Sequence, residues 1–573
     1  MTTALPIYPF EHQRCIGTIC EVGPSSAKVN LPYAASLDGQ WLYGNRLGAG
    51  EVGEFIIIES GDTGIFGRLV SIKLPERDRL SVEPGSGKHD AHPIGTAQLL
   101  TTIALKNGEV TGGIAQHPRL GSCVYAAHPL LLKWLAERTG SGNPTVVFEL
   151  ATLPSAGEIP VIFTPEQLFG HHCAILGATG GGKSWTIARI LEQAMKQNAK
   201  VILFDATGEF HTLGSGVHNV YVGATSAPEA LATEVVVPYF QLTEADLFAL
   251  FKPSGQTQAP KLRAAMKSLK LAKVDPNLAS EGVLVKVNKN RAAFESSNRT
   301  HATTLENPQA DFDISNLVRQ IDAECVWPTS QRDSSSWGGP DEQARSYCVT
   351  LLARIEDMLQ SNEMACIFQP VGKRSLFTEI EQFLSRDNEP VMRISMKFLS
   401  FQQNVREIAA NAVARSLLTL ARQSRFESRP TLVILDEAHQ FLNKSLGDES
   451  NRYALEAFGL IAKEGRKFCL TICIATQRPR DIPEDVLSQM GTLIVHRLTN
   501  DRDREVVERA SGEIDRTAAA FLPTLAPGQA VIIGVDFPIP LTIQICKPQH
   551  EPDSRGPNYQ TCWDASATSP SES

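Results

Sequence analysis

The sequence predicts an α/β protein built around a parallel β-sheet, and three observations lead to this prediction. A short apolar segment at 173–176 runs directly into the glycine-rich stretch GATGGGKS, 177–184, and then into a helical pattern. The apolar segment 432–435 ends on two consecutive acids. Further apolar segments of strand length recur at 201–205, 469–476, 492–498 and 530–536. Strands that alternate with helices in this way favour a parallel sheet with right-handed crossovers.

The remaining elements divide the chain into five parts. Closely spaced short strands with glycine turns predict a small β-barrel over 1–95. A mixed segment, 96–165, connects the barrel to an α/β core that we expect to span 166–241 and 391–548. Between them, helical patterns separated by polar turns predict a helical insertion over 242–390. The end, 549–573, is rich in Ser, Pro, Asp and Glu, which predicts a C-terminal arm or a disordered tail.

Composition limits the class of protein. The 573 residues carry a net charge of −9, from 54 basic and 63 acidic side chains, which argues against a globally basic nucleic-acid coat. A local basic channel stays compatible with that total, because electrostatic fields are local. The sequence has no apolar run long enough for a transmembrane helix and no secretion signal. The scattered cysteines form no CxxC pair, so we expect free thiols and a cytoplasmic protein without membrane contact.

The glycine-rich stretch has the spacing of a phosphate-binding P-loop: Gly177, four residues, Gly182, Lys183 and Ser184. Glycines let backbone N–H groups approach phosphate oxygens, and the following helix directs its positive end at the same anion. We expect Lys183 to reach the β- and γ-phosphates and Ser184 to coordinate Mg²⁺. The residues predicted to bind ATP are Gly177, Thr179, Gly180, Gly181, Gly182, Lys183, Ser184 and Trp185.

Two acids close the strand at 432–435. Ligands of open α/β sheets bind at the carboxyl ends of strands, so Asp436 is expected to hold Mg²⁺ and Glu437 to activate water. Consecutive strand residues point to opposite sides, which would give the two acids different tasks. The alternative is a solvated strand end.

Four further residues near the ends or starts of predicted strands are candidates. Asp205 and Glu209 follow the strand 201–205, and we expect them beside the metal or the water, although Asp205 could instead be a cap or turn residue. Gln477 directly follows the segment 469–476 and could contact the γ-phosphate or the attacking water, or simply form a turn before Pro479. Arg466 precedes that segment and could reach the nucleotide of a neighbouring subunit, or belong to a solvated basic cluster.

Basic side chains that could contact nucleic acid are weakly indicated. Arg263, Lys267 and Lys270 share one stripe of a predicted helix, for which a solvated face is the more common reading. Lys286, Lys289 and Arg291 lie in a polar stretch. Neither group identifies a DNA-binding surface.

Together these motifs resemble the HerA group of the FtsK/HerA superfamily of hexameric P-loop translocases. The resemblance rests on GATGGGKS, FDATGEF, VVVPYFQLTEADLFALF, VILDEAHQFL, AKEGRKF, IATQRPRDIPEDVLSQ and HRLTNDRD, over about 170–545. It implies a RecA-like P-loop NTPase core of the ASCE type and fits the predicted N-terminal barrel. It also implies a homohexamer that hydrolyses ATP with Mg²⁺, in which Lys183, Glu437, Gln477 and a trans-acting Arg466 are catalytic.

The resemblance further implies a ring that threads double-stranded DNA as a translocase or helicase. Archaeal relatives pair with a NurA-like nuclease in DNA-end processing, and bacterial relatives pair with sirtuin-like NADase or nuclease effectors in anti-phage defence. One departure concerns the stretch TPEQLFGHHC, 164–173, which carries His171 and His172 where archaeal relatives are thought to use a second trans-acting arginine. Two alternatives stay open: a ring scaffold that uses ATP to assemble and activate an effector, and, more remotely, a conjugation-type secretion ATPase.

Overall fold

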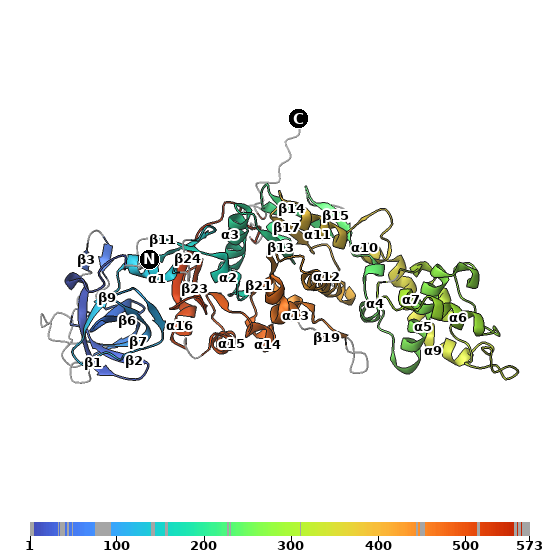
Figure 1. The fold of residues 1–573 in the computed structure, drawn as a ribbon, viewed down its shortest axis with the longest axis horizontal. Coiled ribbons are helices and arrows are strands. Elements are labelled where there is room, and N and C mark those ends of the chain that lie inside the picture. Colours follow the sequence, from blue (N-terminus) through green and yellow to red (C-terminus); the bar gives the residue numbers. More distant parts are fainter. Residues whose placement is uncertain are drawn as a thin grey trace, which may run out of the picture.

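The fold is that of a computed structural model. It describes residues 5–32, 34, 40–42, 45–47, 50–74, 93–138, 144–154, 159–225, 229, 231–309, 311–400, 402–442, 445–446, 453–512, 516–554, 559 and 563. The molecule is elongated, with a β-barrel at one end, a helix-covered sheet in the middle and a group of helices at the other end (Figure 1). Most of the predicted tail 549–573 lies outside the described residues.

The N-terminal barrel is a closed antiparallel sheet. Its strands are β1 (Cys15–Val22), β2 (Ser26–Asn30), β5 (Phe55–Ser60), β6 (Thr63–Lys73), β7 (Ile94–Ala104), β8 (Val110–Gly112) and β9 (Cys123–Ala126). They are ordered β2-β1-β9-β5-β6-β7-β8, and pairing of β2 with β7 closes the ring. Alternate apolar side chains such as Val29, Ile56, Ile65 and Val124 fill the interior, as the two-residue period of a strand requires. A short hairpin of β3 (Gln40–Leu42) and β4 (Asn45–Leu47) stands apart from this sheet.

The stretch 96–165 is divided differently from our expectation. β7, β8 and β9 belong to the barrel, because long-range antiparallel pairing, which single segments do not reveal, continues the sheet to Ala126. α1 (Pro129–Ala136) follows, and β10 (Phe148–Leu153) and β11 (Ile159–Phe163) then join the central sheet. We therefore propose that the barrel domain ends near residue 126 and not near 95.

The central sheet has the order β11-β10-β24-β23-β22-β12-β21-β18-β13-β17-β14-β15-β16. The strands beyond β11 are β12 (Cys173–Leu176), β13 (Lys200–Asp205), β14 (Val217–Val222), β15 (Thr233–Val236), β16 (Arg374–Ser375), β17 (Val391–Ser395), β18 (Thr431–Leu435), β21 (Leu470–Thr476), β22 (Thr492–His496), β23 (Gln529–Gly534) and β24 (Leu541–Ile545). Strands β22 to β16 in this order run parallel, while β23, β24, β10 and β11 add antiparallel pairs at one edge. β21 separates the P-loop strand β12 from the acid-bearing strand β18. The core is thus an α/β P-loop NTPase fold, as predicted.

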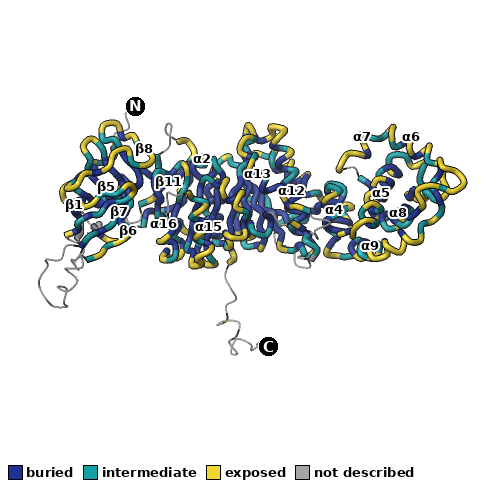
Figure 2. Tube along the Cα trace, turned by 90° about the horizontal axis from the view of Figure 1, so that it is seen from below, coloured by how far each residue is buried: buried dark blue, intermediate teal, exposed yellow. Residues whose placement is uncertain are grey.

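Helices cover both faces of this sheet. α2 (Pro165–Phe169) and α3 (Lys183–Met195) lie in one apolar cluster with one face of the strands, which continues into the base of the barrel. α12 (Val405–Arg422) and α13 (Ala457–Glu464) pack in the cluster on the opposite face. The buried strands therefore run through the centre of the molecule (Figure 2). Smaller elements follow: β19 (Ser445–Leu446), β20 (Tyr453–Ala454), α14 (Glu484–Leu487), α15 (Asp501–Ser511) and α16 (Arg516–Phe521).

The residues between β15 and β17 are mainly helical, and α4, α5, α6, α7 and α9 form the end of the molecule opposite the barrel, while α11 lies beside the central sheet (Figure 1). The helices are α4 (Glu244–Phe251), α5 (Gly255–Val274), α6 (Ala292–Thr300), α7 (Ala302–Leu305), α8 (Leu317–Ala323), α9 (Glu342–Gln360), α10 (Ala365–Phe368) and α11 (Leu376–Ser385). A Thr243–Asp246 capping box fixes the start of α4. None of the helices in the described ranges is both long and apolar enough to cross a bilayer.

Candidate nucleotide-binding site

The glycine-rich loop joins β12 to α3 in the geometry of a P-loop. Gly180 and Gly182 have φ values of 73° and 119°, which side chains rarely adopt, so the glycines are needed for this turn. α3 begins at Lys183, and its positive end faces the loop. The Lys183 side chain is buried, and its ammonium donates to the carbonyl oxygen of Ala178 at 3.3 Å, folded back over the loop.

The two predicted acids lie beside this loop. β18 ends at Leu435, so Asp436 and Glu437 follow the strand, and Glu437 adopts a left-handed conformation with φ of 48°. Our argument that they alternate as strand residues was therefore wrong, because the backbone turns at Glu437. Both side chains are nevertheless buried, and both carboxylates raise the pKa of the Lys183 ammonium, which places them near it. The turn brings the two acids to the same site.

Gln477 links the acids to the loop. Its amide nitrogen donates to the Glu437 carboxylate, and its amide oxygen accepts from the Thr179 hydroxyl. The other oxygen of Glu437 has no hydrogen-bond partner among the described residues, although His439 Nδ1 lies 3.3 Å from it. A buried carboxylate oxygen left in this state can accept a proton from a water molecule placed against it.

The site carries more negative than positive charge. Burial raises the pKa of Asp436 well above its ordinary value, and the carboxylates of Asp205, Glu437 and Glu209 raise it further, while Lys183 opposes them. Burial likewise lowers the pKa of Lys183, which the acids partly offset. A cation bound among these oxygens would relieve the repulsion.

The oxygen-rich donor set fits Mg²⁺. Ser184 and Asp436 supply oxygen atoms of the kind that this hard cation prefers. Within the described residues, no group of three or more His, Cys, Asp or Glu side chains could hold a metal ion by itself. Mg²⁺ usually retains waters and shares its ligands with substrate phosphates, so one carboxylate and one hydroxyl suffice.

Glu209 lies beside the glycine-rich loop. It accepts a hydrogen bond from the Ser184 hydroxyl at 3.0 Å. Burial raises the pKa of Glu209, and the bond from Ser184 opposes that rise. The bond holds Ser184 toward the acid cluster, where its oxygen would be needed for a metal.

Asp205 has a structural task, as the cap or turn alternative foresaw. Its carboxylate accepts from the backbone nitrogens of Gly208 at 2.8 Å and Phe210 at 3.1 Å, and it pairs with Arg393 at 2.7 Å. Arg393 also pairs with Glu229 at 2.5 Å. This network fixes the short loop that presents Glu209.

His496 is a residue of the site that our reading of the sequence missed. It ends β22 and is completely buried against the P-loop. A polar residue that ends an apolar strand is the same signal that identified Asp436, and it could have identified His496. Trp185, which we expected at the nucleotide, lies in the first turn of α3, with the Lys547 ammonium 5.9 Å from its ring centre.

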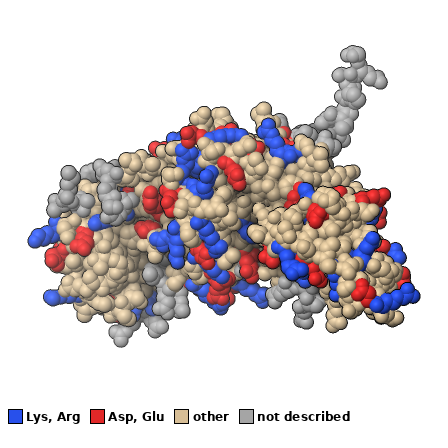
Figure 3. All heavy atoms as spheres, turned by 45° about the vertical axis from the view of Figure 1, so that its right-hand side comes forward, with Lys and Arg blue, Asp and Glu red and all other residues tan. Residues whose placement is uncertain are grey.

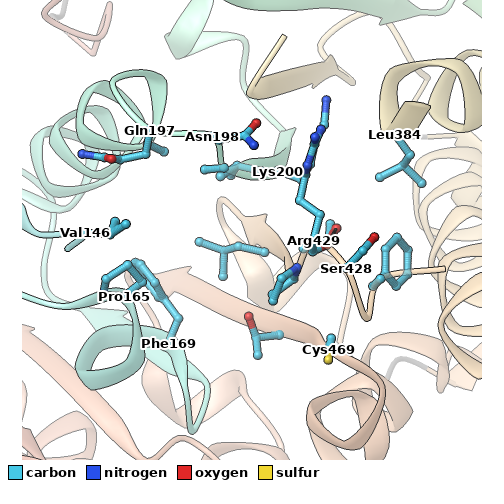
Figure 4. A pocket seen from close by; sticks show the side chains of 18 of the residues that line it. Val146, Pro165, Phe169, Gln197, Asn198, Lys200, Leu384, Ser428, Arg429 and Cys469 are labelled. Carbon is cyan, nitrogen blue, oxygen red and sulfur yellow. Dashed lines mark hydrogen bonds between the residues drawn. The ribbon is translucent and has the colours of Figure 1, made fainter. Parts of the chain in front are cut away.

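Arg466 lies far from the loop of its own chain. It is exposed in the turn before β21 and lines a cavity of about 840 Å³. Lys200 and Arg429 also line this cavity (Figure 4). Lys200 begins β13, which ends at Asp205, and Arg429 comes shortly before β18, which is followed by Asp436. The strand β21 has seven residues, which places Arg466 about 20 Å from Gln477's end of the sheet. Arg466 can therefore not contact a phosphate on the P-loop of its own chain.

Comparison with known families and proteins agrees with this geometry. Residues 148–323 match the family model described as the central domain of helicase HerA. A probable helicase of Methanocaldococcus jannaschii is 24% identical over 443 residues, covering 75% of this chain and 71% of that protein. A DNA double-strand break repair helicase HerA of Pyrococcus furiosus is 23% identical over 451 residues, covering 74% and 73%.

Solved structures also resemble the chain. The bacterial conjugative coupling protein TrwB has a TM-score of 0.42 and 14% identity, with 74% of this chain and 94% of that chain covered. VirB4 of Thermoanaerobacter pseudethanolicus has a TM-score of 0.42 and 12% identity, with 72% and 100% covered.

Proposed function

We propose that this P-loop ATPase is a HerA-type, hexameric, ATP-driven translocase or helicase of double-stranded DNA, and the matches to the HerA central domain and to HerA helicases support this proposal. The observation that carries the ATPase chemistry is the convergence of Lys183, Ser184, Asp436 and Glu437 on one loop. ATP with Mg²⁺ is the cofactor for which this arrangement is suited.

In the proposed reaction, a water molecule attacks the γ-phosphate in line with the leaving oxygen. The Glu437 oxygen without a hydrogen-bond partner takes the proton, and Gln477 holds Glu437 in place through its amide. Lys183 and the loop amides stabilise the charge that develops on the phosphate oxygens. Asp436 and Ser184 hold Mg²⁺, while Glu209 orients Ser184.

We propose that the ring completes this site. Lys183 is the cation whose charge Asp436 and Glu437 act on, and Arg466 of the same chain lies before the start of β21, at the opposite ends of the strands. A neighbouring subunit could present its Arg466 to the phosphates, which is the role of an arginine finger supplied in trans. This proposal predicts that mixing Arg466→Ala and Glu437→Gln subunits, each inactive alone, restores part of the turnover, because an Arg466→Ala subunit keeps its Glu437 and can receive the intact Arg466 of a Glu437→Gln neighbour.

The experiment that tests the ATPase proposal compares purified wild type with Lys183→Ala and Glu437→Gln. We expect Lys183→Ala to lose ATP turnover, and Glu437→Gln to bind ATP while releasing phosphate at least about 100-fold more slowly. Near-normal turnover by either variant would refute the assigned roles. DNA-stimulated turnover and ATP-dependent strand displacement by the wild type test the motor.

A second function, a ring scaffold that uses ATP to assemble and activate an effector, has one observation in its favour. Three of the basic side chains that could have contacted DNA are instead bound to oxygens of the same chain: Arg263 to Glu244 at 2.5 Å, Lys286 to Glu324 at 2.6 Å and Lys270 to the Asn307 carbonyl at 3.1 Å. On the face in Figure 3, acidic side chains lie among the basic ones. A scaffold would show neither DNA-stimulated turnover nor strand displacement.

In either case we propose that the chain acts with a separate effector, either a NurA-like nuclease, a sirtuin-like NADase or another nuclease. Its setting would be DNA-end processing or anti-phage defence. Co-purification with the product of a neighbouring gene, followed by mass measurement and assays of nuclease and NADase activity with and without DNA, tests this. A pair that never forms a complex, and whose activities are unchanged by mixing, would contradict the proposal.

A further inference from the structure

The P-loop rests on a buried histidine. Three of its glycines, Gly177, Gly181 and Gly182, face His496, and a Cβ atom at these positions would lie 2.6, 3.3 and 3.0 Å from atoms of that side chain. Gly180 differs, because a Cβ atom there would meet nothing within 4 Å. Three glycines therefore make room for His496, in addition to any need of the phosphates for close backbone approach.

Both ring nitrogens of His496 are engaged. Nδ1 lies 2.8 Å from the carbonyl oxygen of Gln529, which can only accept, so Nδ1 carries the proton. Nε2 lies 2.8 Å from the Thr186 hydroxyl. Burial lowers the pKa of His496 to about 4, and the Lys183 ammonium contributes to the decrease, so the ring is neutral near pH 7. Nε2 is therefore an acceptor, and the Thr186 hydroxyl, which also lies 3.1 Å from the Gly182 carbonyl oxygen, donates to Nε2 at the shorter distance of 2.8 Å.

These contacts connect two elements that are distant in sequence. Thr186 lies in the first turn of α3 and is completely buried. Gln529 begins β23, and its neighbour Gly528 donates from its backbone nitrogen to the carbonyl oxygen of Gly181 at 3.1 Å. The loop is thus held by two contacts, one with the His496 imidazole and one with the backbone nitrogen of Gly528.

We propose that His496 is a positioning residue of the P-loop, which joins Thr186 to Gln529 through a neutral imidazole and so fixes where the loop amides meet the phosphates of the nucleotide. The inference rests on the proposed function, because it assumes that a triphosphate binds this loop. His496 does not touch the phosphates itself. Its contribution is to hold the amides of the loop in the binding geometry before the ligand arrives.

The test replaces one end of the contact at a time. Thr186→Val removes the donor and keeps the shape, His496→Asn removes the acceptor at the Nε2 position, and Thr186→Ser keeps the hydroxyl as the matched control. We measure the affinity for ATP and for inorganic tripolyphosphate, kcat, KM and the melting temperature. Tripolyphosphate lacks the base and ribose, so it reports on the loop alone.

We expect Thr186→Val and His496→Asn each to weaken binding of both ligands about tenfold, since one buried hydrogen bond is worth about that factor. KM should rise by a similar factor with kcat changed less than about threefold, and Thr186→Ser should resemble wild type. The double variant should be no weaker than the His496→Asn single variant, because both remove the same bond.

Two results would overturn the inference. The first is a fall in melting temperature with unchanged affinity in Thr186→Val, which would make the bond purely structural. The second is additive loss in the double variant, which would mean that the two residues act independently. A wild-type chain that binds neither ATP nor tripolyphosphate would overturn the proposed function as well, and so is distinguishable from either.

Discussion

The buried ion pair between Arg393 and Asp205 offers a quantitative test of how the Glu209 loop is held. Both side chains are fully buried, and Arg393 Nε lies 2.7 Å from the Asp205 carboxylate. Replacing Arg393 with methionine keeps most of the volume but leaves Asp205 and Glu229 without their shared cation. Removing one partner of a buried pair leaves an uncompensated charge and costs about 3–5 kcal/mol.

This cost should be visible as a lower melting temperature of the ATPase core. About 2–4 °C per kcal/mol applies to domains of this size, so Arg393→Met should melt roughly 6–20 °C below wild type. The assay is thermal unfolding followed by circular dichroism or calorimetry, with ATP turnover measured at a temperature where the variant is folded. Turnover should also fall, because Asp205 would no longer fix the backbone that presents Glu209.

The matched control is Arg422→Met, which removes a pair with Glu464 at 2.8 Å whose side chains are 53% and 43% exposed. An exposed pair contributes about 0–1 kcal/mol, so this variant should melt within about 4 °C of wild type. If Arg393→Met lowered the melting temperature no more than Arg422→Met does, the network would not stabilise the loop, and our account of Asp205 would be wrong.

Two further predictions follow from pKa shifts in the site and beside it. Burial and neighbouring acids raise the pKa of Asp436, so its ionised form destabilises the metal-free fold, and the free energy of unfolding falls as pH rises from about 4. Asp436→Asn should therefore raise the melting temperature measured without Mg²⁺ and abolish Mg²⁺-dependent turnover. A lower melting temperature of this variant would contradict the reasoning. Burial, with a smaller contribution from the Arg466 charge, lowers the pKa of His172 to about 4. The contribution of neutral His172 to the free energy of unfolding is therefore complete above about pH 6.5 and is lost as the pH falls toward 4. His172→Asn keeps an acceptor for the Ile472 nitrogen and tolerates the φ of 61°, so its unfolding free energy should depend less steeply on pH between 6.5 and 4; an unchanged slope in denaturant titrations would contradict the assignment.

The residues of the site that could be predicted from sequence are those that come directly after an apolar strand or in the glycine-rich loop that follows one. Lys183, Ser184 and Asp436 belong to local patterns, because a P-loop and an acid at a strand end need only their immediate neighbours. The resemblance to HerA helicases was confirmed by the family model over residues 148–323 and by the curated relatives, and the α/β P-loop fold was confirmed by the order of the central sheet.

The contacts that decide the remaining roles are made between distant segments. Asp205 binds Arg393 and Ser184 binds Glu209, and nothing in the spacing of these residues reveals such partners. Glu437 could not be placed from strand alternation, since its left-handed backbone depends on the turn that follows β18. The barrel boundary was likewise set by long-range pairing of β7 with β2 and β6.

The hydrogen bond from Gly528 to Gly181 joins the glycine-rich loop to a strand that the ribosome makes long after it. The ribosome releases the whole glycine-rich motif, the acids of β18 and the helical insertion before the residues that brace the loop exist. Contacts of such wide separation also form slowly, because the intervening chain must first be ordered. A nascent chain therefore carries the complete motif before it can hold the loop rigidly, and a chain that ended between β22 and β23 would keep His496 but lack the hydrogen bond from Gly528.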